Sequence, residues 1–215
     1  MRLFLVRHYR TEINAQSCIM GWGDSPPVEG WEWDLVAVAK DLESADLDAS
    51  CVYTSELQRA RATGAYFAQE LAIPELISDA ALNEVNYGEL FRRSKKWVAA
   101  HVPEYKTDPD YVFPGGESFH QMQQRSLAFV QGLVAHHPSQ NLLLVVHAGV
   151  IRGLICHFLA LPYASNLKRK ISHRYIGEFQ FESGRCISYN EWGSPSGFVK
   201  QAVIAPPVHC RDQAR

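Results

Sequence analysis

Two apolar segments of the chain each end in a histidine, and both could bring that histidine to an anion. Residues 3–6 form an apolar run that leads into Arg7 and His8, and residues 142–146 form a second run that leads into His147. Arginine binds phosphate oxygens through paired hydrogen bonds and keeps its charge at every working pH. A neutral imidazole is a nucleophile. These residue types together point to phosphate chemistry.

Two further residues fit such a site. Arg59 lies in a segment with helical spacing, and Glu84 precedes a turn expected at Gly88. A helix that begins at Ala148, just after His147, would offer free N–H groups and partial positive charge to an anion. A lone carboxylate is a poor phosphate ligand, so Glu84 is expected to carry a proton.

The elements that must position these residues alternate along the chain. Apolar runs predict strands, and helical spacing of apolar residues predicts the segments between them. Ser55 is expected to cap the second helix. Alternating strands and helices predict a layered α/β fold with a largely parallel sheet, whose ligands lie beyond the carboxyl ends of the strands. The predicted strands cover 2–7, 51–54 and 142–146, the helices 29–45, 56–72, 94–101, 117–136 and 148–159, and a hairpin 174–191.

The composition is that of one globular domain over residues 1–215. Apolar residues make up 47%, charged residues 20%, and the formal net charge is −2, which favours neither nucleic acid nor a membrane surface as a partner. The five cysteines include no C-x-x-C pair. We therefore expect neither a disulfide framework nor a zinc site, and we expect a reducing cytoplasm. The tail 193–215 has little periodicity and is expected to be partly ordered or mobile.

Five motifs resemble, in the same order, those of the histidine phosphatase superfamily, which includes the cofactor-dependent phosphoglycerate mutases. The match spans about residues 1–155 and covers the family patterns R-H-G-x-T-x-x-N, S-x-L-x-R-A-x-x-T, L-x-E-x-x-x-G, P-G-G-E-S-x(6)-R and H-G-G-V-I-R. The motifs are Arg7-His8 with Asn14, residues 55–63, Leu82-Asn83-Glu84 with Tyr87-Gly88, residues 114–118 with Arg125, and residues 147–152.

This resemblance implies a three-layer α/β/α fold and a role for each matched residue. His8 would attack phosphorus and become a phosphohistidine, and Glu84 would protonate the leaving alkoxide and then activate water. Arg7, Arg59 and His147 would bind the phosphoryl oxygens. The resemblance implies a monomer or homodimer that acts on a small phosphorylated substrate. It implies neither a metal nor a cofactor. Residues expected to contact this substrate are Tyr9, Asn14, Gly21 and Ala148.

The chain also departs from the family pattern. Tyr9 replaces the glycine that follows the nucleophile, Arg10 stands where an acidic residue is common, and Met20 stands where a small hydroxyl residue is frequent. Tyr9 could alter the substrate pocket or block turnover. Asn14 could merely cap a turn, and we expect Arg152 to be a structural ion-pair partner.

Four functional alternatives follow. The short segment 87–114, which covers the pocket in this family, favours a phosphatase, and residues 146–152 mildly resemble the α-ribazole phosphatase branch. A phosphoglycerate mutase is the second reading. The third is a degenerate member that binds phosphorylated ligands or proteins but turns over poorly. A metalloenzyme using His8, His147 and Glu84 is disfavoured because two nearby arginines repel a cation. Six further histidines are expected to be structural or solvated, namely His101, His120, His136, His137, His157 and His209.

Overall fold

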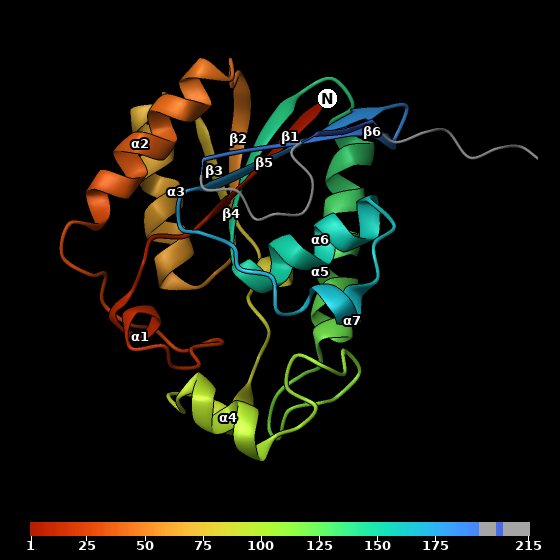
Figure 1. The fold of residues 1–215 in the computed structure, drawn as a ribbon. Coiled ribbons are helices and arrows are strands. Elements are labelled where there is room, and N and C mark those ends of the chain that lie inside the picture. Colours follow the sequence, from red (N-terminus) through yellow and green to blue (C-terminus); the bar gives the residue numbers. More distant parts are fainter. Residues whose placement is uncertain (194–200, 204–215) are drawn as a thin grey trace, which may run out of the picture.

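A seven-stranded sheet forms the centre of the computed structural model, which describes residues 1–193 and 201–203 (Figure 1). The strand order is β3-β2-β4-β1-β5-β6-β7. The strands are β1 (Arg2–Arg7), β2 (Ala49–Thr54), β3 (Glu75–Ser78), β4 (Asn141–Val146), β5 (Tyr175–Glu182), β6 (Arg185–Gly193) and β7 (Gln201–Val203).

The sheet has a parallel half and an antiparallel half. β3, β2, β4 and β1 pair in parallel, whereas β5, β6 and β7 pair antiparallel beyond β1. β1 and β4 are buried on both faces because their interior residues are all apolar, as is usual for parallel strands covered by helices. These two strands are neighbours, in register from Leu3 opposite Leu142 to Arg7 opposite Val146. Their carboxyl ends, with His8 and His147, therefore meet at one edge.

Helices cover both faces and give the predicted three layers (Figure 1). Phe4 and Val6 of β1 pack in one apolar cluster with residues of α2 and α3, and Leu3 and Leu5 pack in another with residues of α5 and α6. The α/β prediction is thereby confirmed. The helices are α1 (Glu12–Ala15), α2 (Trp31–Ser44), α3 (Gln58–Glu70), α4 (Lys95–His101), α5 (Phe119–His136), α6 (Ala148–Phe158) and α7 (Tyr163–Asn166), with short 3-10 turns at Ala80–Leu82 and Gly88–Leu90.

The start of α3 differs from the prediction. The helix begins at Gln58, with Leu57 rather than Ser55 at its N-cap position. The Ser55 hydroxyl is instead within 2.7 Å of Nε2 of His147. The expected cap was wrong because α3 begins later than predicted, and Ser55 accepts from the N–H of Leu57, at 3.3 Å, ahead of the helix.

Segment 87–114 covers one end of the sheet and carries α4 (Figure 1). Aromatic rings hold it in place: Tyr87, Tyr105 and Phe113 contact one another, and Phe113 packs against Phe119 of α5. Within the tail 193–215, β7 pairs with β6. The other residues beyond Gly193 lie outside the described ranges, so whether they are mobile stays a prediction. None of the helices in the described ranges combines the length and apolar character needed to cross a bilayer.

Candidate active site

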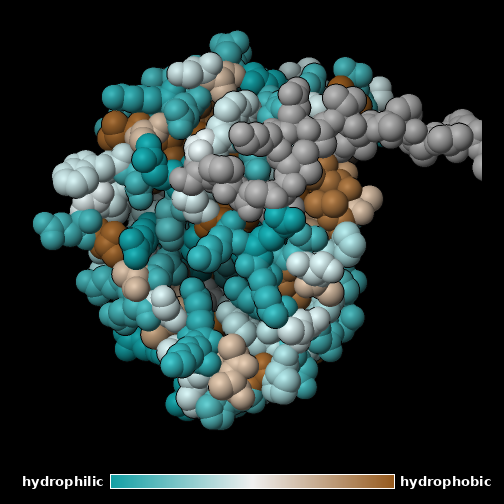
Figure 2. Space-filling view, in the orientation of Figure 1, coloured by the Kyte–Doolittle hydropathy of each residue, from teal (hydrophilic) through white to brown (hydrophobic). Residues whose placement is uncertain are grey.

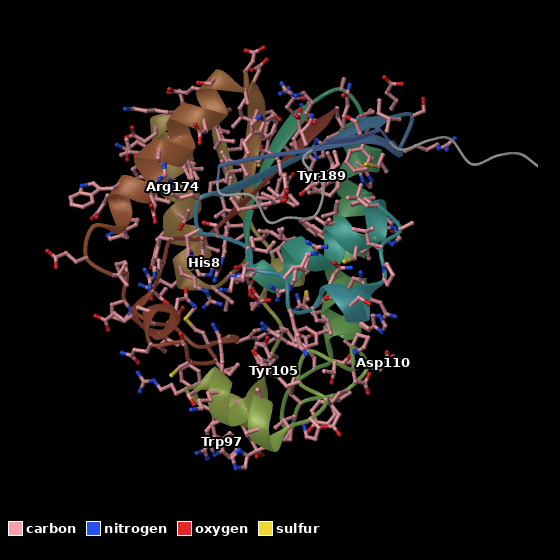
Figure 3. All side chains as sticks on the ribbon, viewed as in Figure 1. His8, Trp97, Tyr105, Asp110, Arg174 and Tyr189 are labelled. Carbon is pink, nitrogen blue, oxygen red and sulfur yellow. The ribbon has the colours of Figure 1, made fainter. Side chains whose placement is uncertain are left out.

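A cavity of about 460 Å³ opens beyond the carboxyl ends of β1 and β4. This volume suits a small metabolite. Figure 2 shows hydrophilic side chains gathered around a hollow on this face, and Figure 3 places His8 in the interior, between Arg174 and Tyr105. Ten of the lining residues are arginine or lysine, whereas only Asp34 and Glu84 are carboxylates. We call Arg7, His8, Arg59, Glu84 and His147 the floor of this site; the first four line the cavity, and His147 lies buried beside His8.

His8 is held as a neutral imidazole with one nitrogen free. Its Nδ1 lies 2.6 Å from the carbonyl oxygen of Tyr9. A carbonyl only accepts a hydrogen bond, so Nδ1 must carry the proton and Nε2 the lone pair. Burial lowers the pKa of His8 well below its usual value, and the charge of Arg59 lowers it further. The imidazole is therefore unprotonated at neutral pH, as a nucleophile must be.

His147 lies beside His8, with 5.0 Å between the two ring centroids. Its Nε2 contacts the Ser55 hydroxyl at 2.7 Å, which fixes the ring. Its Nδ1 is buried and has no hydrogen-bond partner within the described residues. Burial lowers the pKa of this histidine as well. A buried polar nitrogen without a partner is costly, and a ligand oxygen in the cavity would satisfy it.

Two guanidinium groups complete the positive side of the floor. Arg59 donates to the carbonyls of Gly23 at 2.8 Å and Gly21 at 2.6 Å, and Arg7 donates to the carbonyl of Ile171. Burial lowers the pKa of Arg7 to about 9 and that of Arg59 to about 10, so both stay charged at neutral pH. The Nε atoms of both arginines lack a partner in the described part of the chain.

Glu84 faces the first turn of α6. Its Oε2 accepts from the backbone N–H of Gly149 at 3.1 Å, and its Oε1 accepts from that of Val85 at 3.1 Å. A Cβ on Gly149 would lie 2.0 Å from Oε1 of Glu84, so only glycine permits this approach. Arg125 donates to the Glu84 carbonyl at 3.0 Å and is itself paired with Glu117 at 2.6 Å. The carboxylate is thus fixed from both sides.

The four expected substrate contacts have different positions. Asn14, Gly21 and Ala148 line the cavity. Asn14 also caps α1, where its side chain accepts from the N–H of Thr11, so the capping and the pocket-lining readings both describe it. The expected contact of Tyr9 with substrate is wrong. The Tyr9 ring packs against Trp31, with 4.7 Å between the ring centroids, in the apolar cluster under α2. The Tyr9 carbonyl contacts His8 and its ring lies edge-on to that of His8, but Tyr9 does not line the cavity, so its side chain does not block it.

Several cavity residues were missed by the sequence analysis. His173 donates from Nδ1 to the carbonyl of His8 at 2.8 Å, and its ring lies 5.4 Å from that of His8. Lys95, Lys106 and Arg152 form what we call the basic wall. Arg152 was expected in an ion pair, but it donates to the carbonyl of Arg169 at 3.1 Å and forms no salt bridge within residues 1–193.

Arg152 ends the motif at residues 147–152, but its place in the cavity was not predicted. No motif marked Lys95, Lys106 or His173, which only the fold brings to the cavity. Among the described residues, no group of three or more histidine, cysteine or acidic side chains is arranged to hold a metal ion.

A buried neutral histidine, two guanidinium groups and a carboxylate beyond the ends of parallel strands define a phosphoryl-transfer enzyme. The sequence profile of the histidine phosphatase superfamily (branch 1) matches residues 3–192. The chain belongs to this superfamily, which confirms the resemblance found in its motifs.

Curated relatives are mutases by name. The chain is 32% identical over 162 residues to the 2,3-bisphosphoglycerate-dependent phosphoglycerate mutase of Bartonella bacilliformis, covering 71% of this chain and 79% of that protein. It is 31% identical over 179 residues to the mutase of the same name from Brucella melitensis, covering 79% and 87%.

Solved structures with the same fold include proteins named as phosphatases. Bacillus stearothermophilus YhfR matches with a TM-score of 0.77 at 26% identity, over 86% of this chain and 93% of that one. A mycobacterial glucosyl-3-phosphoglycerate phosphatase matches with a TM-score of 0.72 at 26% identity, over 83% and 92%. The α-ribazole phosphatase of Shigella flexneri matches with a TM-score of 0.74 at 25% identity, over 86% and 93%.

Proposed function

We propose that the chain is a phosphomonoester hydrolase that acts on a small phosphorylated metabolite through a phosphohistidine at His8. The observation that carries this proposal is the fixed tautomer of His8. Its Nδ1 donates to the Tyr9 carbonyl, so Nε2 carries the lone pair and can attack a phosphate bound at the floor of the cavity. A covalent intermediate divides one difficult displacement into two easier ones.

In the first step, Nε2 of His8 forms a bond to phosphorus as the bond from phosphorus to the ester oxygen breaks. Glu84, in its carboxylic acid form, gives its proton to the departing alkoxide, and the alcohol leaves. In the second step, Glu84 as carboxylate takes a proton from water, whose oxygen bonds to phosphorus as the bond to Nε2 breaks. Phosphate leaves, and both residues return to their starting states.

The floor also supplies charge where the transition state needs it. The transferring phosphoryl group spreads negative charge over its oxygens, and fixed positive groups stabilise that charge. Arg7 and Arg59 stay ionised, and the unpartnered Nδ1 of buried His147 adds a further hydrogen-bonding group. In this proposal, catalysis depends on positioning and electrostatics supplied by the side chains of the floor.

The second candidate is a phosphoglycerate mutase. It is supported by the names of the relatives from Bartonella and Brucella. A mutase must retain its phosphorylated intermediate and exclude water, and the short segment 87–114 offers little chain for such a cover. The phosphatase names among the solved structures support the hydrolase. Assays of 2- and 3-phosphoglycerate interconversion separate the two, since a mutase interconverts them and releases little free phosphate.

The hydrolase is tested with p-nitrophenyl phosphate at mildly acidic pH. We expect the wild type to release phosphate and His8→Ala to lose at least ~10³-fold in rate, as removal of a nucleophile does. His101→Ala is a matched control, because His101 is exposed on α4. Equal, negligible release by wild type and His8→Ala would favour the degenerate binding protein and overturn the proposal.

A further inference from the structure

The basic wall holds more positive charge than the proposed hydrolysis uses. A phosphomonoester carries about −2 near neutral pH, and Arg7 and Arg59 already match that charge. Lys95, Lys106 and Arg152 line the same cavity in addition. The chain as a whole has a net charge of −2, so this concentration of cations is local. Arg7 and Arg59 therefore balance the charge of the phosphoester, and the positive charge of the basic wall is left uncompensated.

Arg152 is the strongest sign that a partner is missing. Its side chain is 5% exposed, yet it forms no salt bridge within residues 1–193, and its Nε has no hydrogen-bond partner there. Its Nη1 donates a hydrogen bond to the backbone carbonyl of Arg169. Buried charges are normally paired or bound to a ligand. An anion in the cavity would supply that pairing.

Lys106 points to the same place from segment 87–114. Its ammonium lies 5.4 Å from the centroid of the Tyr105 ring and pairs with no carboxylate among the described residues. The charges that act on it are mainly those of Arg152 and Lys95, with Glu84 as the nearest opposing charge. Together with burial, these cations lower the pKa of Lys106 to about 7. Like charges facing one another without an anion are destabilising, and a bound anion relieves this.

We infer that the substrate carries a second anionic group, a carboxylate or a further phosphate, and that Lys106 and Arg152, with Lys95, bind it. This inference rests on the proposed function, in which the first phosphate occupies the floor. With the first phosphate bound by Arg7 and Arg59, a second anion elsewhere in the same molecule would face the basic wall. Lys168 and Lys170 line the cavity and are exposed, so they would attract such a substrate without being needed to hold it.

The test compares pairs of esters that differ in the second anion. Glycerol 3-phosphate and 3-phosphoglycerate differ by a carboxylate, whereas fructose 6-phosphate and fructose 1,6-bisphosphate differ by a phosphate. We expect kcat/KM to favour the more anionic member of at least one pair by about 10- to 100-fold, the usual effect of charge-assisted hydrogen bonds. The pair that shows the preference identifies the anion.

Variants connect this preference with the wall. Lys106→Met should reduce the ratio of kcat/KM within that pair to about 3-fold or less, and Lys106→Arg should restore most of it. Lys96→Met is the matched control, because Lys96 neighbours Lys95 on α4 but is exposed and lies outside the cavity. It should keep the wild-type ratio. Absence of a preference in both pairs, or equal ratios in Lys106→Met and Lys96→Met, overturns the inference.

Failure of the proposed function is recognised separately. If no ester releases phosphate, the hydrolase is wrong, and binding of the same pairs to the wild type is then measured by calorimetry. Tighter binding of the more anionic member, lost in Lys106→Met and kept in Lys96→Met, would still support the second anion site. Equal binding of both members would overturn it.

Discussion

The floor and the basic wall of one cavity are held in different ways. Floor residues are fixed by bonds to buried backbone: His8 through the Tyr9 carbonyl, and Glu84 through the N–H groups of Gly149 and Val85. Lys106 of the basic wall, by contrast, has an aromatic ring and other cations around it. A site that must align reacting atoms needs rigid support, whereas one that recognises charge does not. We therefore expect changes to the floor to affect the rate, and changes to the wall to affect selectivity.

The largest effect that separates the two regions is expected from Glu84→Gln. Loss of a general acid and base should lower kcat by about 10²- to 10⁴-fold. Formation of the phosphoenzyme from p-nitrophenyl phosphate should suffer less, because p-nitrophenolate leaves without a proton, so the phosphohistidine should accumulate. Burst kinetics followed at the absorbance of p-nitrophenolate measure this.

Glu89→Gln is the control for that experiment, because Glu89 is exposed on the next turn of the chain. It should behave as wild type. An equal loss of kcat in both variants, or a Glu84→Gln protein that turns over an alkyl phosphate normally, would remove Glu84 from the chemistry.

Gly149→Ala should disturb the same carboxylate without removing it. The added methyl group would lie 2.0 Å from Oε1 of Glu84, and the helix backbone cannot move far, so the carboxylate must shift. A displacement of about 1 Å near reacting atoms costs about 10²-fold in kcat. Steady-state kinetics with an alkyl phosphate measure the loss, and circular dichroism checks the fold.

Gly132→Ala on α5 is the matched change, because a Cβ there meets nothing within 4 Å. It should keep full activity and gain about 0.5–1 kcal/mol in the free energy of unfolding. Equal activity of the two alanine variants would show that the close approach of Glu84 to α6 is not needed.

The smallest effect belongs to the wall and concerns pH. The pKa of Lys106 in the free protein is about 7. Below that pH the side chain is a charged ammonium, and above it the side chain loses its proton and its charge. The groups that face it are Arg152, Lys95, Arg7 and Glu84. The preference in kcat/KM for the more anionic ester should therefore fall, by about 10-fold at most, as pH rises from 6 to 8.5.

Lys106→Met should show no such change over this range, because the titrating group is absent. A preference that stays constant with pH in the wild type would assign the selectivity to groups other than Lys106.

The same contrast explains what the sequence could and could not predict. The floor lies at the ends of β1 and β4, and an uninterrupted apolar run reveals such strands, so His8 and His147 could be placed together beforehand. Tyr9 could not be placed, because it follows the strand and its orientation depends on contact with Trp31 at the start of α2. Lys106 and His173 lie in connections without periodicity, where only the assembled fold shows what they face.

The central claim is that His8 alone among three neighbouring histidines accepts the phosphoryl group. The direct measurement is rapid quenching during turnover of p-nitrophenyl phosphate, in base to preserve phosphohistidine, followed by mass spectrometry of the peptides and ³¹P NMR. We expect a phosphoryl group on Nε2 of His8, because Nδ1 of His8 is held by the Tyr9 carbonyl. A phosphoryl group on His147 or His173, or turnover with no phosphohistidine at all, would contradict it.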